Sequence, residues 1–189
     1  WARVMAQTVY YFTAAAKLGA PDQPVAFSVP TGNFGDVFAG YVAAQMGLPV
    51  AHLMVATNVN DILARTMDSG VYQTGDVVAT SSPSMDIQVS SNFERLLFEL
   101  TGRDASRVRG YMDALTQSGR FEMASDELTL MRALFGAIRI DQQQTLDVMR
   151  QVKAEHHMQI DPHSAIGVGA ARQAVLADGV PIVSLATAH

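Results

Sequence analysis

The sequence has 189 residues, of which 49% are hydrophobic and 16% are charged. A chain of this length can bury one substantial core, so we expect one domain or most of one. The formal net charge is −5, and no run of basic residues alternates with aromatic ones, which argues against a nucleic-acid partner. The absence of cysteine excludes disulfides and thiolate chemistry and fits a cytoplasmic location.

The two ends of the sequence indicate whether it is a fragment, and its most apolar stretch indicates whether it could span a membrane. Trp1 already lies within an expected helix, and His189 follows directly on an apolar run, so we interpret the sequence as an excised fragment. No secretory signal is visible. Residues 37–56 are strongly apolar, but a glycine and a proline divide them into pieces too short to span a membrane, so no membrane partner is expected.

Apolar periodicity in the first half predicts strands that alternate with helices. The first helix carries an apolar stripe made of Trp1, Val4, Met5, Val9, Phe12 and Ala16. After it we expect a strand at 25–29, a helix at 36–46, a strand at 50–56, a helix at 62–68, a small strand at 77–78 and an amphipathic segment at 88–100.

The second half begins with a segment of different composition and periodicity. Residues 101–139 contain most of the arginines and have helical periodicity, which predicts a helical excursion from the main domain. Asp141 with Gln144 resembles a capping box for a helix that runs to about residue 156. Asp161 followed by proline predicts the next helix, at 164–176, and a last strand covers 181–186. The alternation predicts an α/β fold with a mostly parallel central sheet flanked by helices.

The loop after the first predicted strand is the most informative segment, with the sequence PTGNFGD at 30–36. A strand leads into it and a helix begins directly behind it, so free backbone N–H groups and the positive helix end converge, as a phosphate requires. Gly32 and Gly35 allow positive φ and close backbone approach, while Thr31 and Asn33 offer side-chain donors. A packing turn is the alternative, and Asp36 is expected to cap the helix.

Four segments, in this order, resemble the signature segments of the threonine synthase family, which has the fold type II pyridoxal-phosphate architecture. They are SVPTGNFGDVFAGY at 28–41, VATNVNDILARTMDSGVY at 55–72, SPSMDIQVSSNFERLLF at 82–98 and IDPHSAIG at 160–167. The opening WARVMAQTVYYF and the closing ATAH are also similar. The resemblance covers nearly the whole chain except 101–139, and implies that residues 1–189 are part of the large, cofactor-binding domain.

The resemblance implies a reaction and a cofactor. The intact enzyme would use pyridoxal 5′-phosphate to convert O-phosphohomoserine and water to threonine and phosphate. The cofactor phosphate would lie in the loop, and a hydroxyl after the last strand would face the pyridine nitrogen. By this resemblance the cofactor-binding residues are Thr31, Gly32, Asn33, Phe34, Gly35 and Thr187.

Pyridoxal chemistry also needs a lysine that forms a Schiff base with the cofactor. The sequence has two lysines, Lys17 and Lys153, and both lie in ordinary amphipathic helices. In the family, the Schiff-base lysine precedes the segment that resembles the opening residues. We therefore expect an upstream lysine-bearing domain of the same chain, no covalent cofactor on this fragment, and no activity of the fragment alone. No metal is expected.

Other polar residues are candidates for substrate binding. Ser84, Asn92 and Arg95 belong to a polar cluster before and within an amphipathic helix, where an arginine could clamp a substrate phosphate or form an ordinary ion pair. His163 follows Asp161 at a predicted helix start, where a neutral imidazole could face the substrate or simply complete the cap.

Two rival functions stay open. Another enzyme of the same fold, a dehydratase or a sulfhydrylase, would not need a second anion site for a phosphorylated substrate. A free-standing phosphate-binding module would need no lysine-bearing domain at all.

Overall fold

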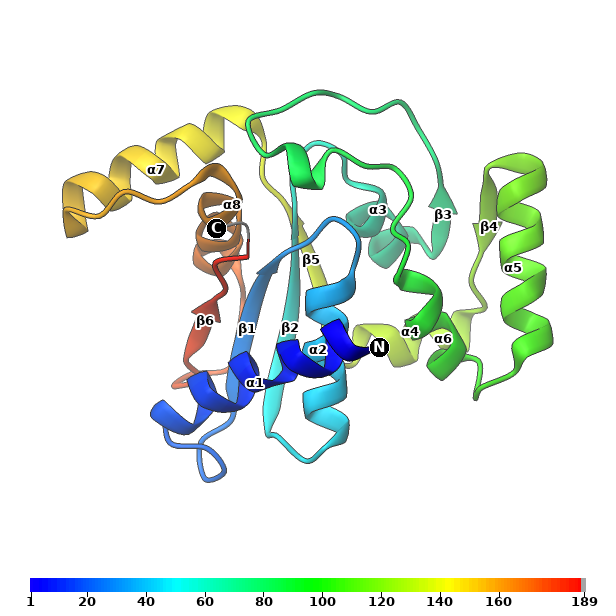
Figure 1. The fold of residues 1–189 in the computed structure, drawn as a ribbon, viewed down its shortest axis with the longest axis horizontal. Helices are drawn as coiled ribbons and strands as arrows, with labels where there is room; N and C mark the ends of the chain where they lie inside the picture. Colours follow the sequence, from blue (N-terminus) through cyan, green and yellow to red (C-terminus); the bar gives the residue numbers. More distant parts are fainter. Residues whose placement is uncertain (188–189) are drawn as a thin grey trace.

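The computed structural model describes residues 1–187, so the last two residues of the closing ATAH lie outside the described part. A four-stranded sheet forms the centre, with the order β5-β2-β1-β6 and parallel pairing throughout (Figure 1). The strands are β1 (Val25–Pro30), β2 (Val50–Thr57), β5 (Phe135–Arg139) and β6 (Ile182–Ser184). The predicted α/β fold with a mostly parallel sheet is confirmed.

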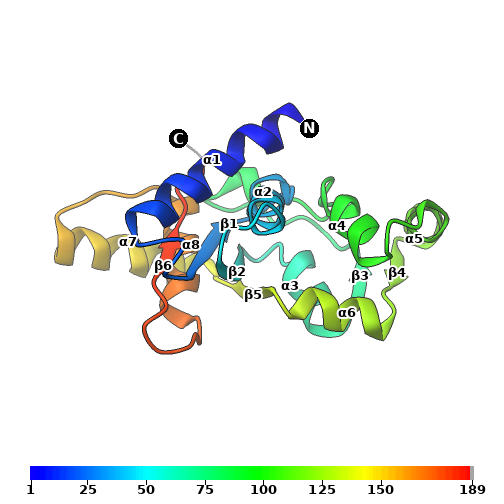
Figure 2. The same ribbon diagram turned by 90° about the horizontal axis from the view of Figure 1, so that it is seen from below.

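Helices cover both faces of this sheet. The ring of Phe27 in β1 lies 4.7 Å from that of Tyr11 in α1 (Ala2–Lys17), whereas the hydroxyl of Ser28 donates to the carbonyl of Gly167 in α8 (Pro162–Gln173). Because successive side chains of a strand point to opposite faces, α1 and α8 lie on opposite sides of the sheet (Figure 2). Alongside α1 lies α2 (Gly35–Gln45), and α7 (Gln142–His156) packs on α8.

One glycine allows α1 and α2 to approach closely. A Cβ on Gly40 of α2 would lie 2.6 Å from a ring carbon of Tyr11, so only glycine lets α1 cross α2 at this distance. The buried side of α1 therefore consists of Val4, Thr8, Tyr11 and Ala15. The expected apolar stripe is wrong in part, since Trp1, Met5 and Val9 are 68%, 47% and 54% exposed.

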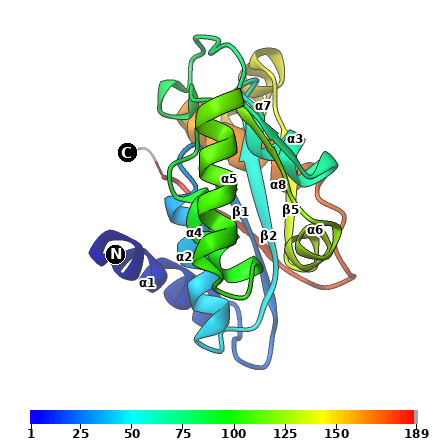
Figure 3. The same ribbon diagram turned by 90° about the vertical axis from the view of Figure 1, so that its right-hand side faces the viewer.

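A second, smaller unit lies beyond the β5 edge of the sheet in Figure 1, and its helix α5 lies in front of the sheet in Figure 3. We call residues 71–73 and 93–132 the outer unit. Its elements are β3 (Val71–Gln73), α4 (Phe93–Leu100), α5 (Ala105–Ser118), β4 (Arg120–Glu122) and α6 (Ser125–Arg132), and β3 pairs antiparallel with β4. Between β3 and α4, η1 (Pro83–Met85) is a single 3₁₀ turn, and α3 (Ile62–Ser69) precedes β3.

Two expectations about this region are wrong. The small strand lies at β3 and not at 77–78, which is irregular. Residues 101–139 are not helical throughout, because β4 interrupts them and β5 pairs in parallel with β2 from Leu53 to Thr57. Pairing with a neighbouring strand overrides the helical periodicity of Phe135–Arg139.

The predicted helix starts in the second half are confirmed by their caps. The Asp141 carboxylate accepts from the Gln144 N–H at 2.8 Å, and the Gln144 side chain accepts from the Asp141 N–H at 2.8 Å. Asp161 caps α8, which begins at Pro162, two residues earlier than expected. No helix among residues 1–187 is long and apolar enough to cross a membrane.

Candidate functional site

The loop from β1 to α2 lies at the carboxyl edge of the parallel sheet, where open α/β sheets bind their ligands. The N–H of Thr31 still donates to the carbonyl of Ala56, which continues the sheet ladder for one residue. Beyond it, the N–H of Gly35 donates to the side-chain oxygen of Asn33. Within residues 1–187, no acceptor is found for the N–H groups of Gly32, Asn33, Phe34 and Asp36. Four free donors beside a helix N-terminus form a concavity suited to an anion.

The loop keeps its shape differently from what we expected. The left-handed residue is Phe34, with φ 67°, and neither Gly32 nor Gly35 has positive φ. The Phe34 ring is 1% exposed and lies edge-on to Phe93 at 5.3 Å, and this packing holds the unusual backbone. Gly32 is required for a different reason, since a Cβ there would lie 2.7 Å from the Ser84 carbonyl oxygen.

The start of α2 is capped by Asn33 and not by Asp36. The Asn33 side-chain oxygen accepts from the N–H of Gly35 at 2.9 Å, whereas the expected cap makes no such bond. The carboxylate of Asp36 is instead partly buried, and its Oδ1 has no hydrogen-bond partner among the described residues. Burial raises the pKa of Asp36 to about 6, and the positive charge of Arg3 opposes this rise.

Two cavities meet in front of the loop. The smaller, of about 270 Å³, is lined by Arg3, Gln7, Pro30, Gly32, Asn33, Asp36, Ser84, Met85, His163 and Thr187. The larger, of about 540 Å³, shares Arg3, Gln7, Asp36 and Thr187 with it. The structure therefore brings together five of the predicted site residues: Gly32, Asn33, Ser84, His163 and Thr187.

Three predicted residues belong to the loop but do not line the two cavities. Thr31 is 5% exposed, and its hydroxyl donates to the Val29 carbonyl. The rings of Phe34 and Phe93 pack together in the core, and Gly35 forms the first turn of α2.

Asn92 and Arg95 lie elsewhere. Asn92 is behind the loop, where its Nδ2 donates to the Asn33 carbonyl. The Nε of Arg95 donates to the Asn92 side chain at 3.0 Å, and its guanidinium lies 4.8 Å from the Trp1 ring centroid. Arg95 lines a separate cavity beside α4, so its position does not suit a clamp on an anion in the loop.

His163 connects the start of α8 to the Ser84 segment. Its Nδ1 lies 3.1 Å from Asp161, and its Nε2 accepts from the Ser84 N–H at 3.3 Å, an arrangement that places the proton of a neutral ring on Nδ1. Burial works against the ionised Asp161 carboxylate, but hydrogen bonds from Ser164 and His163 outweigh it and lower the pKa of Asp161. The imidazole thus both completes the cap and lines the cavity.

Sequence reasoning missed Arg3, Gln7 and Asp36. Arg3 and Gln7 are four residues apart on α1 and therefore share a helix face, a spacing that could have marked them as a pair. The side-chain oxygen of Gln7 is buried and, like that of Asp36, has no partner in the described part of the chain. These side chains give the cavity one cation and two acceptors beside the four free N–H donors.

Lysines and metal ligands are not part of this arrangement. Lys17 ends α1 and Lys153 lies in α7, both side chains are exposed, and neither lines the two cavities. Within residues 1–187, no group of three or more histidine or acidic side chains could hold a metal ion.

No family model matches the chain. A threonine synthase of Pseudomonas aeruginosa is 52% identical over 189 residues, which are 100% of this chain and 40% of that protein. A threonine synthase of Brucella melitensis, solved with pyridoxal phosphate bound, superposes with a TM-score of 0.97 at 56% identity and covers 100% of this chain and 40% of that one.

The chain is a relative of the threonine synthases. The yeast threonine synthase structure has a TM-score of 0.92 at 38% identity, over 100% of this chain and 41% of that one. The predicted resemblance is thereby confirmed, and the chain spans about 40% of the length of these threonine synthases. Maize serine racemase, at 15% identity and a TM-score of 0.59, shares the fold alone.

Proposed function

We propose that this chain supplies the phosphate-binding side of a pyridoxal 5′-phosphate site in a threonine synthase that acts on O-phosphohomoserine. The observation that carries the proposal is the row of unpaired N–H groups at the start of α2. The related threonine synthase of known structure has pyridoxal phosphate bound, which supports the choice of anion.

The residues of the loop fit such a phosphate. Gly32, Asn33 and Phe34 would donate backbone N–H groups to it, and the positive end of α2 adds to their attraction. Thr187 lines both cavities and would offer its hydroxyl to the ring of the cofactor. Pyridoxal phosphate, when bound, supplies an electron sink for carbanions next to an amino group.

The chain's own polar residues would orient the substrate. Arg3 brings a positive charge to the cavity and would attract an acidic substrate group. His163 keeps its Nε2 on the Ser84 N–H, so it fixes the segment that forms the wall opposite Gly32. Ser84 is exposed at that wall and would contact the substrate.

Residues 1–189 would then belong to the large domain, with the Schiff-base lysine in an upstream domain of the same chain. Without that lysine we expect no covalent cofactor and no activity from this chain alone. A visible absorption band that survives dialysis and disappears in Lys17→Ala or Lys153→Ala would contradict this. The proposal includes a cytoplasmic location.

A chimera tests the activity. The corresponding segment of the Pseudomonas aeruginosa relative is replaced by this chain, and threonine formation from O-phosphohomoserine is measured together with phosphate release. We expect both products in equal amounts. Gly32→Ala should abolish them, because its Cβ would collide with the Ser84 backbone, whereas Gly110→Ala in α5, where a Cβ meets nothing within 4 Å, should not.

The rival functions predict other results. Deamination of serine or threonine without phosphate release would indicate a dehydratase, and use of sulfide as the nucleophile would indicate a sulfhydrylase. A folded chimera that binds phosphate but catalyses none of these reactions would support a phosphate-binding module.

A further inference from the structure

We propose that Ser90 and Asn92 are positioning residues that aim two N–H groups of the loop at its anion. The Ser90 hydroxyl donates to the carbonyl of Gly32 at 2.8 Å. The carbonyl of Asn33 accepts from both the backbone N–H and the side-chain Nδ2 of Asn92, each at 3.0 Å. The inference rests on the anion-binding role proposed above.

The geometry of the peptide group connects these bonds to the anion site. In a trans peptide the C=O and the following N–H are coplanar and point in opposite directions. The carbonyl of Gly32 is held towards Ser90, so the N–H of Asn33 points the other way. In the same manner, Asn92 holds the carbonyl of Asn33 and thereby directs the N–H of Phe34. Both belong to the N–H groups that have no acceptor in the described residues.

The two carbonyl bonds also strengthen the donors that they orient. A carbonyl that accepts a hydrogen bond polarises its peptide group, and the N–H of that group becomes a better donor. Asn33, whose carbonyl accepts twice, confers the stronger effect on the N–H of Phe34. An anion would then meet donors that need no reorientation on binding, which reduces the cost of binding.

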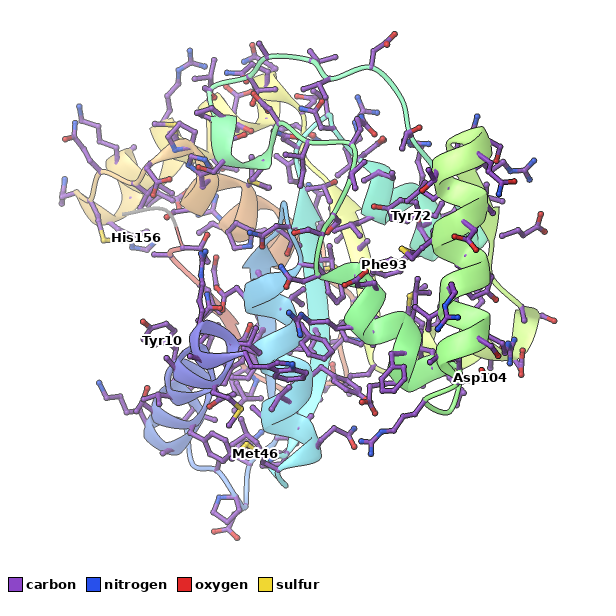
Figure 4. All side chains as sticks on the ribbon, turned by 45° about the vertical axis from the view of Figure 1, so that its right-hand side comes forward. Tyr10, Met46, Tyr72, Phe93, Asp104 and His156 are labelled. Carbon is purple, nitrogen blue, oxygen red and sulfur yellow. The ribbon has the colours of Figure 1, made fainter. Side chains whose placement is uncertain are left out.

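The outer unit keeps Ser90 in place. Ser90 is 4% exposed, and its N–H donates to the Tyr72 hydroxyl at 2.8 Å. The Tyr72 ring stacks on Phe93 at 5.5 Å and on Phe121 at 4.8 Å, so rings from β3, α4 and β4 form one rigid stack (Tyr72 and Phe93 are labelled in Figure 4). Asn92 is held in turn by the Arg95 guanidinium. Asn92 and Arg95, both predicted to bind substrate, thus act on the loop from behind, Asn92 directly and Arg95 through Asn92.

The test uses inorganic phosphate and the ¹⁵N-labelled protein, with binding followed by amide chemical shifts. Ser90→Ala should weaken phosphate binding by about 3- to 10-fold, the amount expected for one net hydrogen bond. In the free protein its largest amide shift change should fall on Asn33. Ser91→Ala is the matched control, because Ser91 is exposed and makes no side-chain hydrogen bond in the described structure.

Asn92→Ala provides a second variant, since Asn92 is only half-buried and its loss should leave the fold intact. Its main shift change should fall on Phe34, and its phosphate affinity should fall by about 3-fold, because the backbone donor remains. If Ser90 and Asn92 only stabilised the fold, each variant would lower the thermal stability. The largest amide shift changes would then not fall on Asn33 for Ser90→Ala and on Phe34 for Asn92→Ala.

The outcomes separate the two proposals. If the unmodified protein binds no phosphate, the anion site proposed above is overturned. The unmodified protein could instead bind phosphate with the same affinity as Ser90→Ala, or Ser90→Ala and Ser91→Ala could have equal affinities. Either result overturns the positioning role while the anion site stands.

Discussion

The carboxyl edge of the sheet and the outer unit differ in whether their polar groups have partners within the chain. In the outer unit, the Glu127 side chain is fully buried, accepts from the Tyr111 hydroxyl at 2.6 Å and the Ala124 N–H at 3.1 Å, and lies 2.6 Å from the Arg107 guanidinium. At the sheet edge, four N–H groups and the Oδ1 of Asp36 have no partner in residues 1–187. Paired buried groups hold a fold together, whereas unpaired ones leave binding energy for a ligand.

The largest effect is expected from the buried carboxylate of Glu127. Glu127→Ala removes the acceptor of two hydrogen bonds and the partner of the Arg107 ion pair, and we expect the free energy of unfolding to fall by about 3 kcal/mol. Urea denaturation measures this change. Phosphate affinity, measured well below the unfolding transition, should change by less than about 2-fold. A loss of stability below about 1 kcal/mol would mean that the carboxylate is not a central support of the outer unit.

The next largest effect concerns the loop itself. Gly32→Val places a branched side chain where even a Cβ would lie 2.7 Å from the Ser84 carbonyl, so the loop must move. We expect phosphate binding to weaken by about 100-fold, because one or two hydrogen bonds to a charged ligand are lost. Isothermal titration calorimetry measures the affinity. Gly110→Val in α5 is the control and should bind phosphate normally.

A smaller effect is expected from the cation of the site. Arg3→Gln removes the one positive side chain that lines both cavities in the described structure. Phosphate affinity should fall by about 5-fold in low salt, since an exposed charge contributes about 1 kcal/mol. The difference between the two proteins should shrink as salt is added, because salt screens exposed charges. A difference that does not depend on salt would contradict an electrostatic role.

The smallest expected effect is a pH-dependent change in anion affinity that depends on Asp36. Burial raises its pKa to about 6, so the carboxyl is neutral at pH 5 and ionised at pH 8, where it repels an anion in the loop. Sulfate affinity should therefore fall as the pH rises through 6. Asp36→Asn should bind sulfate about 3-fold more tightly than the unmodified protein at pH 8 and equally at pH 5. An equal ratio at both pH values would show that the carboxylate does not face the anion.

The comparison also explains how far the sequence predicts the structure. Strands β1 and β2 and the glycine-containing loop after β1 rest on local signals, and their positions agree with the prediction. The caps at Asp141 and Asp161 are local as well. In contrast, β5 has helical periodicity and becomes a strand only because β2 pairs with it, a contact made across about 80 residues of chain.

The candidate site is likewise predicted only in part. Gly32, Asn33, Ser84, His163 and Thr187, which the motifs predict as site residues, line one cavity. Arg3 and Asp36 were missed because their place in the cavity depends on how α1 crosses α2, which no local pattern encodes.

Asn92 and Arg95 are predicted to contact the substrate because they share a polar cluster with Ser84 in the sequence. The chain turns between them and Ser84, which places Ser84 at the cavity and the other two behind the loop.

The most direct test of the central claim is a comparison of pyridoxine 5′-phosphate with pyridoxine, two ligands that lack the aldehyde and differ only in the phosphate. Amide shifts of the ¹⁵N-labelled protein are followed during each titration. The account predicts saturable downfield shifts at Gly32, Asn33, Phe34 and Asp36 with pyridoxine 5′-phosphate, competition by inorganic phosphate, and no binding of pyridoxine. Equal binding of both ligands, or shifts confined to other parts of the chain, would contradict it.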